Sequence, residues 1–358
     1  MHQKTESDTK GIPARHSLIC LSEPFVIPWL KPKEQKFKPV TFCLQSFLYR
    51  YLCGGESMRS LRQVSRKKLA LTGSGANYFD ADVIKLSEEI AQFSKAVDIF
   101  SNNDFSVEVL RKAHGCFSIE NASHFRTTAG WIGKSAEESE YMLPVQPDEI
   151  AGYLDNLVEF LRLAHVETYQ KAIIAHTQLL KIHPFADLNG RTARALMVSL
   201  LRREQVDVIP PVFFRYLCSR ESYLQSANSV GLNDLRQTEH DFWRQAYLWA
   251  ESIENEINLL VEKVQNILVS ATVLTGINAD SQALLKYLWQ QPLVTTKLIS
   301  AKLNMTTVRA NSAINQLINC QVLIPRQISS TSRDVVFECH EVMKLYQAVE
   351  SKLFKVKE

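Results

Sequence analysis

Apolar residues recur at spacings of three and four over most of the chain, which is the pattern of amphipathic helices. The clearest example runs from Tyr78 to Phe100, with apolar positions at Val83, Ile84, Leu86, Ile90, Phe93, Val97 and Phe100. The same spacing predicts further helices over 45–51, 60–71, 106–114, 147–163, 168–182, 192–201 and 213–229. The pattern therefore predicts a mainly α fold.

Capping residues mark where several of these helices begin. Asn103 or Asp104 is the expected N-cap of the helix over 106–114. Pro147, followed by two acidic residues, suits the first turn of the helix that continues to Leu163. We therefore expect a polar break before each of these two helices.

The last third of the chain has a different pattern. Residues 252–274 form a long amphipathic stretch, which suits a connecting helix or the surface of a homodimer. Two shorter helices over 294–303 and 306–320 follow, and a strand is expected over 334–339. Two helices followed by a polar hairpin resemble a winged helix-turn-helix module. Its candidate groove-facing and wing residues are Arg309, Asn311, Asn315, Arg326 and Arg333.

These few positive charges leave two interpretations of the module about equally favoured, DNA binding and protein contact. The predicted organisation is an N-terminal arm over 1–59, partly disordered, and a helical domain over 60–250. A connecting helix over 251–274 and the winged-helix-like module over 275–358 follow it.

Composition narrows the protein class. The 358 residues suit two or three domains, and 46% hydrophobic with 22% charged residues is typical of a soluble globular protein. The seven cysteines are scattered without a CxxC pair, which indicates reduced thiols and argues against a zinc site. The chain shows no signal peptide and no apolar run of membrane-spanning length, so the expected location is cytoplasmic, without a membrane partner.

The candidate chemistry lies in one stretch, His183-Pro-Phe-Ala-Asp-Leu-Asn-Gly-Arg-Thr-Ala-Arg194. It predicts a loop that feeds the N-terminus of a helix, where free N–H groups and the helix dipole attract an anion. Arg191 and Arg194 share a helix face and can hold phosphate oxygens. Asp187 suits Mg²⁺ shared with phosphates, and His183 can accept a proton near neutral pH. This combination favours phosphoryl or nucleotidyl transfer.

The stretch resembles the core motif of the Fic family, HPFx(D/E)GNGRxxR. It agrees at His183, Pro184, Phe185, Asp187, Asn189, Gly190, Arg191 and Arg194, and it departs at Leu188. The resemblance implies an all-α fold, covering roughly residues 60–250, and transfer of AMP from ATP to a Ser, Thr or Tyr hydroxyl of a protein target or of the chain itself.

The resemblance also implies residue roles. His183 is the catalytic base, Asp187 holds Mg²⁺, and Phe185 anchors the loop in the core. The nucleotide-binding residues are then Leu188, Asn189, Gly190, Arg191, Arg194 and, in the following helix, Tyr223. For Tyr223 the alternative is core packing, which the pattern favours. If position 188 needs a positive φ, a leucine there costs about 1–2 kcal/mol and its side chain can crowd the nucleotide. The alternative is that Leu188 points away and contributes only its N–H.

Two further segments resemble regulatory and docking elements of the family. Thr72 to Asn77 matches the ends of the inhibitory pattern (S/T)xxxE(G/N), with Ala76 at the glutamate position, which implies a derepressed enzyme. The alternative is a glycine-rich turn at Gly73 and Gly75. The segment from His124 to Gly133 resembles the start of the family's target-docking flap, whose expected residues are Trp131, Ile132, Tyr141 and Met142. Core packing is the alternative for Trp131 and Ile132.

Some single residues have simpler interpretations. Arg126 is expected to be a structural ion-pair partner, and His176 a core histidine with its hydrogen bonds satisfied. Two rivals to AMP transfer also remain. One is phosphoryl, uridylyl or phosphocholine transfer on the same fold. The other is a DNA-binding regulator whose Fic domain is disabled by Leu188.

Overall fold

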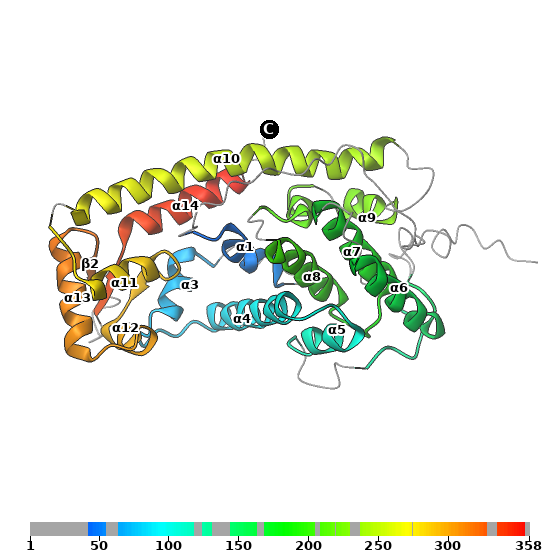
Figure 1. The fold of residues 1–358 in the computed structure, drawn as a ribbon, viewed down its shortest axis with the longest axis horizontal. Helices are drawn as coiled ribbons and strands as arrows, with labels where there is room; N and C mark the ends of the chain where they lie inside the picture. The colour runs from blue at the N-terminus through cyan, green and yellow to red at the C-terminus, as the bar shows by residue number, and fades with distance from the viewer. Residues whose placement is uncertain are drawn as a thin grey trace, which may run out of the picture. The chain divides into compact units, whose positions relative to one another are not determined.

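A computed structural model describes residues 42–54, 64–117, 124–130, 144–162, 168–204, 208–218, 220–229, 237–273, 275–327 and 335–354. It is mainly helical, as the spacing of apolar residues predicted. The chain divides into two compact units (Figure 1). The first comprises the described residues of 92–248, and the second comprises the described residues of 36–91 and 249–358.

The first unit is built around two buried helices. Helix α7 (Thr168–Ile182) lies between α6 (Ile150–Arg162) and α8 (Asn189–Arg203), as Figure 1 shows. Every residue of α7 from Tyr169 to Ile182 is buried, apart from the half-buried Lys171. Burial on all sides is expected for a helix at the centre of a bundle. The end of α7 and the beginning of α8 therefore lie in the core, and the six residues between them are held from both sides.

Three further elements belong to this bundle. Helix α5 (Val107–His114) packs against α6 and α8, and α9 (Arg220–Ser229) packs against α7 and the 3₁₀ helix η3 (Pro211–Tyr216). The N-cap of α5 is Ser106, whose hydroxyl accepts the N–H of Val109 at 3.2 Å. The prediction of Asn103 or Asp104 was wrong because Ser106, one residue before the helix, has the extended backbone that an N-cap needs.

Other boundaries differ from the predictions by a few residues. The 3₁₀ turn η2 (Pro147–Glu149) with a capping box at Gln146 leads into α6, which confirms the predicted start at Pro147. Helix α8 begins at Asn189, three residues earlier than predicted, so Gly190 and Arg191 lie in its first turn. The single helix predicted over 213–229 is two elements, η3 and α9.

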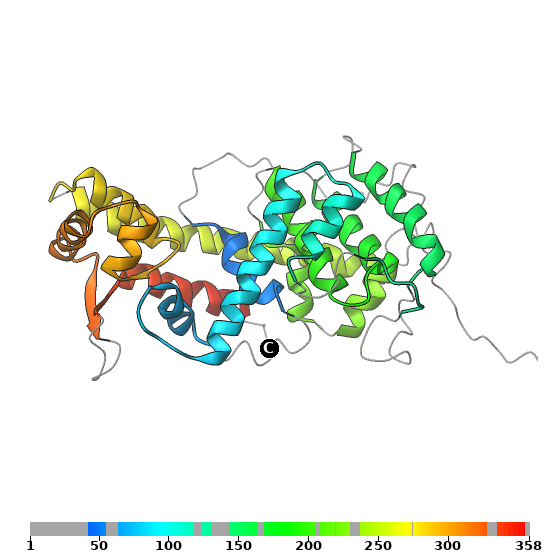
Figure 2. The same cartoon turned by 90° about the horizontal axis from the view of Figure 1, so that it is seen from below.

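The second unit combines N-terminal and C-terminal pieces of the chain. Its elements are α1 (Leu44–Leu52), α3 (Arg66–Gly73), α11 (Ala279–Leu288), β1 (Leu293–Val294), α12 (Thr296–Lys302), α13 (Thr307–Asn319), β2 (Ile324–Gln327), β3 (Val335–Glu338) and α14 (His340–Phe354). Helices α4 (Ala81–Asn102) and α10 (Gln237–Val273) each belong to both units. Figure 2 shows the two long helices from a second direction.

Helices α12 and α13 and the strands β2 and β3 stand in the C-terminal part of this unit, and their assignment to a winged helix-turn-helix module stays a prediction. The sheet is antiparallel with the order β1-β3-β2, and Val294 pairs with Phe337 and Arg326 with Val336. Thr306 caps α13, as predicted, by accepting the N–H of Arg309 at 3.3 Å. The guanidinium of Arg309 forms two bonds to Asp280, at 2.8 and 2.5 Å, and Arg326 pairs with Glu338 at 3.2 Å. These two arginines are therefore already paired with carboxylates.

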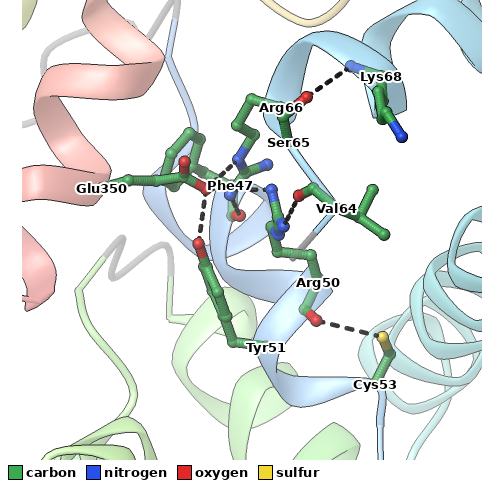
Figure 3. Close-up of polar contacts among 9 residues, drawn as sticks. All are labelled: Phe47, Arg50, Tyr51, Cys53, Val64, Ser65, Arg66, Lys68 and Glu350. Atoms are coloured by element: carbon green, nitrogen blue, oxygen red, sulfur yellow. Dashed lines mark hydrogen bonds and ion pairs between the residues drawn. The ribbon is translucent and has the colours of Figure 1, made fainter. Parts of the chain in front are cut away.

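Glu350 of α14 connects the N-terminal helices to the C-terminal ones (Figure 3). Its Oε1 accepts hydrogen bonds from Arg50 Nη1 at 3.1 Å, Tyr51 Oη at 2.5 Å and Arg66 Nε at 2.6 Å. The guanidinium of Arg66 also lies 3.7 Å from the centre of the Phe47 ring. Arg50 and Arg66 are buried, so this ion-pair cluster fixes α1 and the start of α3 against α14.

Along the second half of α10 the exposed apolar residues are Leu259, Ile267, Val269 and Val273. A homodimer surface on this helix stays a prediction. None of the helices among the described residues is long and apolar enough to span a membrane.

Candidate active site

The loop over residues 183–188 joins α7 to α8, and we call it the α7–α8 loop. Non-glycine residues with left-handed backbone stand at both its ends, His183 with φ of 47° and Leu188 with φ of 61° and ψ of 11°. A left-handed residue other than glycine costs about 1–2 kcal/mol, so surrounding contacts must hold each of them in place. The positive φ considered for position 188 is therefore observed.

Asn189 and Phe185 hold the middle of the loop. The Asn189 side chain accepts the N–H of Phe185 at 2.9 Å and donates to the carbonyl of Phe185 at 2.8 Å. The Phe185 ring is buried, stacked on His114 with a centroid distance of 3.6 Å and tilted against Phe125 at 5.6 Å. The amide of Asn189 is thus occupied in shaping the loop, and only its main-chain N–H remains for a phosphate.

The first turn of α8 offers main-chain donors. The N–H groups of Arg191 and Thr192 both donate to the carbonyl of Leu188 at 3.1 Å. Within the described residues, the N–H groups of Asn189 and Gly190 have no such acceptor. Free N–H groups at a helix N-terminus are an anion-binding feature, so the structure provides two of the donors that the sequence predicted.

Arg194 lies close to these donors. A Cβ atom added to Gly190 would lie 3.3 Å from Arg194 Nη1, so the absence of a side chain at Gly190 leaves room for this guanidinium. Arg194 is buried in α8, while Arg191 is half-buried. The structure thus brings together Gly190 and Arg194, two of the predicted nucleotide-binding residues.

The His183 imidazole is neutral, with one ring nitrogen free to accept a proton. Its Nδ1 lies 3.3 Å from the carbonyl of Leu180, and because a carbonyl only accepts, Nδ1 is the protonated nitrogen and Nε2 carries the lone pair. Burial lowers the pKa of His183 to about 4, and the positive charge of Arg126 acts in the same direction. The imidazole is therefore neutral at pH 7 and able to accept a proton.

Arg126 supports His183 through main-chain contacts. Its Nε donates to the carbonyl of His183 at 2.7 Å, and its other nitrogens donate to the carbonyls of Thr128, Val145 and Ile182. The Arg126 N–H donates to the carbonyl of Pro184 at 2.9 Å. The predicted structural role of Arg126 agrees with these contacts, but its partners among the described residues are carbonyl groups at and near the end of α7 and not carboxylates.

Asp187 is exposed at the outer side of the loop, and its Oδ1 accepts the N–H of Leu188 at 2.6 Å. No group of three or more His, Cys, Asp or Glu side chains able to hold a metal is found in the described part of the chain. A single carboxylate does fit Mg²⁺, because this ion commonly takes one or two protein carboxylates and completes its shell with water and substrate phosphates.

His176 and Tyr223 lie in the core of the bundle. His176 Nε2 lies 2.7 Å from the Tyr223 hydroxyl, and both side chains are buried. Burial, together with Arg194 and Arg215, lowers the pKa of His176 to about 3. Its predicted place in the core is confirmed, and Tyr223 takes the core position that the sequence left as the alternative to nucleotide contact.

The residues of the predicted inhibitory segment belong to the second unit. Thr72 lies in the last turn of α3, whereas Ala76 lies in a bend and Asn77 in an irregular stretch after the helix. The carbonyl of Ser74 accepts the N–H of Thr295 at 3.1 Å, and Ala76 packs against a cluster of Ala70, Leu293, Val336 and Met343. A single helix over 72–77 is not formed, because Gly75 adopts a φ of 77° and turns the chain. The glycine-rich turn is the interpretation that agrees with the structure.

The residues of the predicted docking flap, Trp131, Ile132, Tyr141 and Met142, lie outside the described residues.

Two residues that contact the loop were not anticipated from the sequence, His114 and Thr192. His114 Nδ1 lies 2.8 Å from Thr192 Oγ1, and Thr192 Oγ1 lies 3.1 Å from the carbonyl of Leu188. Their residue types carry no signal alone, because a histidine in one helix and a threonine in another meet only in the folded bundle.

Comparison with known proteins supports the resemblance noted above. Residues 104–201, which contain α5 to most of α8, match the model of the Fic/DOC family. The chain is 32% identical over 146 residues to protein adenylyltransferase fic-1 of Caenorhabditis elegans, covering 40% of this chain and 26% of the relative. It is 27% identical over 218 residues to protein adenylyltransferase Fic of Culex quinquefasciatus, covering 58% of this chain and 42% of the relative.

The chain thus spans less than half the length of these two relatives. Among solved structures, a Fic family protein from Desulfovibrio desulfuricans aligns with a TM-score of 0.42 at 14% identity, covering 83% of this chain and 85% of that one.

Proposed function

We propose, from the premise that residues 104–201 form a Fic/DOC family domain, that this chain transfers AMP from ATP to a hydroxyl group of a protein. The observation that carries the proposal is the convergence at one loop of a neutral histidine, two free N–H groups, a buried arginine and an exposed carboxylate. The hydroxyl belongs to a Ser, Thr or Tyr of a partner protein or of the chain itself.

The proposed reaction is an in-line displacement at the α-phosphorus of ATP. His183 Nε2 accepts the proton of the attacking hydroxyl, whose oxygen forms a bond to the α-phosphorus. The bond from that phosphorus to the bridging oxygen breaks, and pyrophosphate leaves with the electron pair. The N–H groups of Asn189 and Gly190 and the Arg194 guanidinium are placed to stabilise the negative charge of the phosphates.

Asp187 is the residue that would hold Mg²⁺ together with the phosphates. When bound, the ion supplies positive charge that offsets the phosphate charge. The orientation of the His183 imidazole does not depend on a ligand. Its Nδ1 contacts the carbonyl of Leu180, and Arg126 holds the main-chain carbonyl of His183.

We include the absence of self-inhibition by residues 72–77 in the proposal. Ala76 carries no carboxylate that could pair with Arg194, and the segment is a turn in the second unit. Exchanging Ala76 for Glu should leave ATP affinity and self-modification unchanged, because the turn is held by its contacts to Thr295 and the apolar cluster. A marked loss of ATP affinity in Ala76→Glu would show that the segment does reach the site.

DNA binding is not part of the proposal. On α13 the guanidinium of Arg309 is paired with Asp280, and on β2 Arg326 is paired with Glu338, so the positive charge of one groove-facing candidate and one wing candidate is offset by a carboxylate.

The test is transfer from ATP labelled at either end. Label from α-³²P-ATP, but not from γ-³²P-ATP, should appear on protein, and His183→Ala should reduce it by about 10²–10⁴-fold because it removes a general base. Lys95→Ala, which shortens an exposed side chain of α4, is the control. Label from the γ position would indicate phosphoryl transfer, and label from neither would refute transferase activity.

A further inference from the structure

The carbonyl of Leu188 is the point at which the left-handed end of the α7–α8 loop is held. Three donors converge on it at 3.1 Å each: the N–H of Arg191, the N–H of Thr192 and the hydroxyl of Thr192. Rotation of Leu188 out of the left-handed region would turn this carbonyl away from all three. It would also redirect the N–H groups of Asn189 and Gly190, which follow directly in the chain.

The Thr192 hydroxyl is itself fixed by His114. A hydroxyl has one proton, and Thr192 gives it to the carbonyl of Leu188, which can only accept. The bond of 2.8 Å between Thr192 Oγ1 and His114 Nδ1 must therefore have the histidine as donor. The direction of donation is from His114 to Thr192 and from Thr192 to Leu188, which sets the tautomer of His114.

His114 contacts the loop at a second point. Its ring is stacked on Phe185 with an interplanar angle of 4°, and Phe185 is bonded at both its N–H and its carbonyl to the side chain of Asn189. The His114 imidazole thus contacts Phe185 directly and Leu188 through Thr192. A phenyl ring of similar shape would pack equally well on Phe185, so the hydrogen bond is what the histidine adds.

We propose that His114 and Thr192 are positioning residues that hold Leu188 in its left-handed conformation and so aim the N–H groups at the start of α8 toward the polyphosphate. The inference rests on the proposed function for the identity of the ligand. His114 does not touch the reacting atoms in this role. Burial keeps the imidazole neutral at pH 7, since the pKa of His114 is lowered to about 4, with the charge of Asp187 acting in the opposite direction.

Four variants separate positioning from general packing. Thr192→Val keeps the shape and removes the hydroxyl, and Thr192→Ser is its matched control because it keeps the hydroxyl. His114→Phe keeps the stacked ring and removes the donor, whereas His114→Asn places an amide donor near the position of Nδ1 and removes the ring.

The expected result is a rise in KM for ATP in the variants that lose the hydrogen bonds. Thr192→Val and His114→Phe should each raise KM about 5- to 30-fold, the factor that corresponds to the strain of a left-handed leucine. Thr192→Ser should stay near wild type, and the double variant should be no worse than Thr192→Val. The pH dependence of kcat should be unchanged, because His183 is untouched.

Leu188→Gly provides the decisive comparison. Glycine adopts a positive φ without cost, so this change should restore most of the ATP affinity in the Thr192→Val background. Independent, additive effects of His114→Phe and Thr192→Val would overturn the proposal, as would a failure of Leu188→Gly to rescue Thr192→Val.

A stability measurement keeps this test separate from the proposed function. Urea unfolding of the wild type, Leu188→Gly, Thr192→Val and the double variant gives a coupling free energy that needs no nucleotide. Wild-type protein that transfers no AMP would refute the proposed function, while the coupling would still support or overturn the positioning role. If Thr192→Val does not fold, the same cycle with His114→Phe and its control His114→Asn replaces it.

Discussion

The α7–α8 loop and the turn after α3 solve the same backbone problem in opposite ways. Both need a left-handed residue after or before a helix, which is Leu188 in the loop and Gly75 in the turn. At Gly75 a Cβ atom would lie 3.0 Å from Thr295 Oγ1 and 3.2 Å from Leu298 Cβ, so packing excludes a side chain there. At Leu188 a side chain is present, and the strain is held by polar contacts from Thr192.

The charged side chains of the two units also differ in whether they are paired with one another. In the second unit the buried guanidiniums of Arg50 and Arg66 share the carboxylate of Glu350. At the loop, Arg126 donates only to main-chain carbonyls among its described contacts, and Asp187 is exposed. The second unit uses glycine and ion pairs to fix its structure, whereas the loop leaves donors and a carboxylate available for a ligand. The difference teaches that activity and stability should respond to different substitutions.

The largest expected effect is on activity, at Asp187. Asp187→Asn should lower the rate of AMP transfer about 10²–10³-fold in saturating Mg²⁺, because the amide cannot replace the charge that the ion requires. Unfolding by urea should change by less than about 0.5 kcal/mol, because the side chain is exposed. Equal rates in the variant and the wild type would remove Asp187 from the site.

The counterpart in the second unit is Glu350. Glu350→Gln should lower the free energy of unfolding by about 2–4 kcal/mol, because two buried guanidiniums then lose the carboxylate that they share. This range lies below the value of about 3–5 kcal/mol for a fully buried ion pair, because the Glu350 side chain is partly exposed. Chemical denaturation gives the value. Asp82→Asn on the exposed face of α4 is the control, and a matching small effect in both variants would contradict the structural role of Glu350.

Substitution at the two left-handed positions should change stability by different amounts. Gly75→Ala should destabilise the chain by about 1–3 kcal/mol, since it adds both strain and a close contact. Leu188→Gly should change stability by about 1 kcal/mol or less, because relief of strain is offset by the greater flexibility of glycine in the unfolded chain. Thermal unfolding of both variants checks this, and destabilisation of similar size at both sites would break the comparison.

The last prediction is a pH dependence of stability to which three histidines of the first unit contribute. Burial lowers the pKa values of His114, His176 and His183 to about 4, 3 and 4, below the usual value of 6.5. Between pH 6.5 and pH 4 the unfolded chain therefore binds more protons at these sites, so stability falls as pH falls through this window. His114→Phe should make the decline shallower, as measured by urea unfolding at several pH values. An identical slope in the two proteins would contradict the lowered pKa of His114.

Much of the fold could be predicted because its helices are amphipathic. The boundaries of α7 and the N-cap of α13 follow directly from apolar spacing and from Thr306. The start of α8 was placed late because Asn189 and Gly190 are residues typical of turns, and only the bonds from Asn189 to Phe185 show why a helix begins there. The segment over 72–77 was ambiguous because its partners, Thr295 and Leu293, lie more than two hundred residues further along the chain.

The site likewise contains residues that the sequence could predict and residues that it could not. His183, Gly190 and Arg194 belong to one short motif, so their spacing along the chain is enough to group them. His114 lies 78 residues from Thr192, and their hydrogen bond depends on how α5 packs against α8. Contacts of this kind are a property of tertiary packing and have no local sequence pattern.

The central claim is that the α7–α8 loop binds the phosphates of ATP. A crystal structure of the His183→Ala variant with ATP and Mg²⁺ tests it most directly, because the nucleotide stays intact. The account predicts phosphate oxygens within hydrogen-bonding distance of the N–H groups of Asn189 and Gly190 and of Arg194, with Leu188 still left-handed. A loop that stays empty at saturating nucleotide, or a nucleotide bound elsewhere, would contradict it.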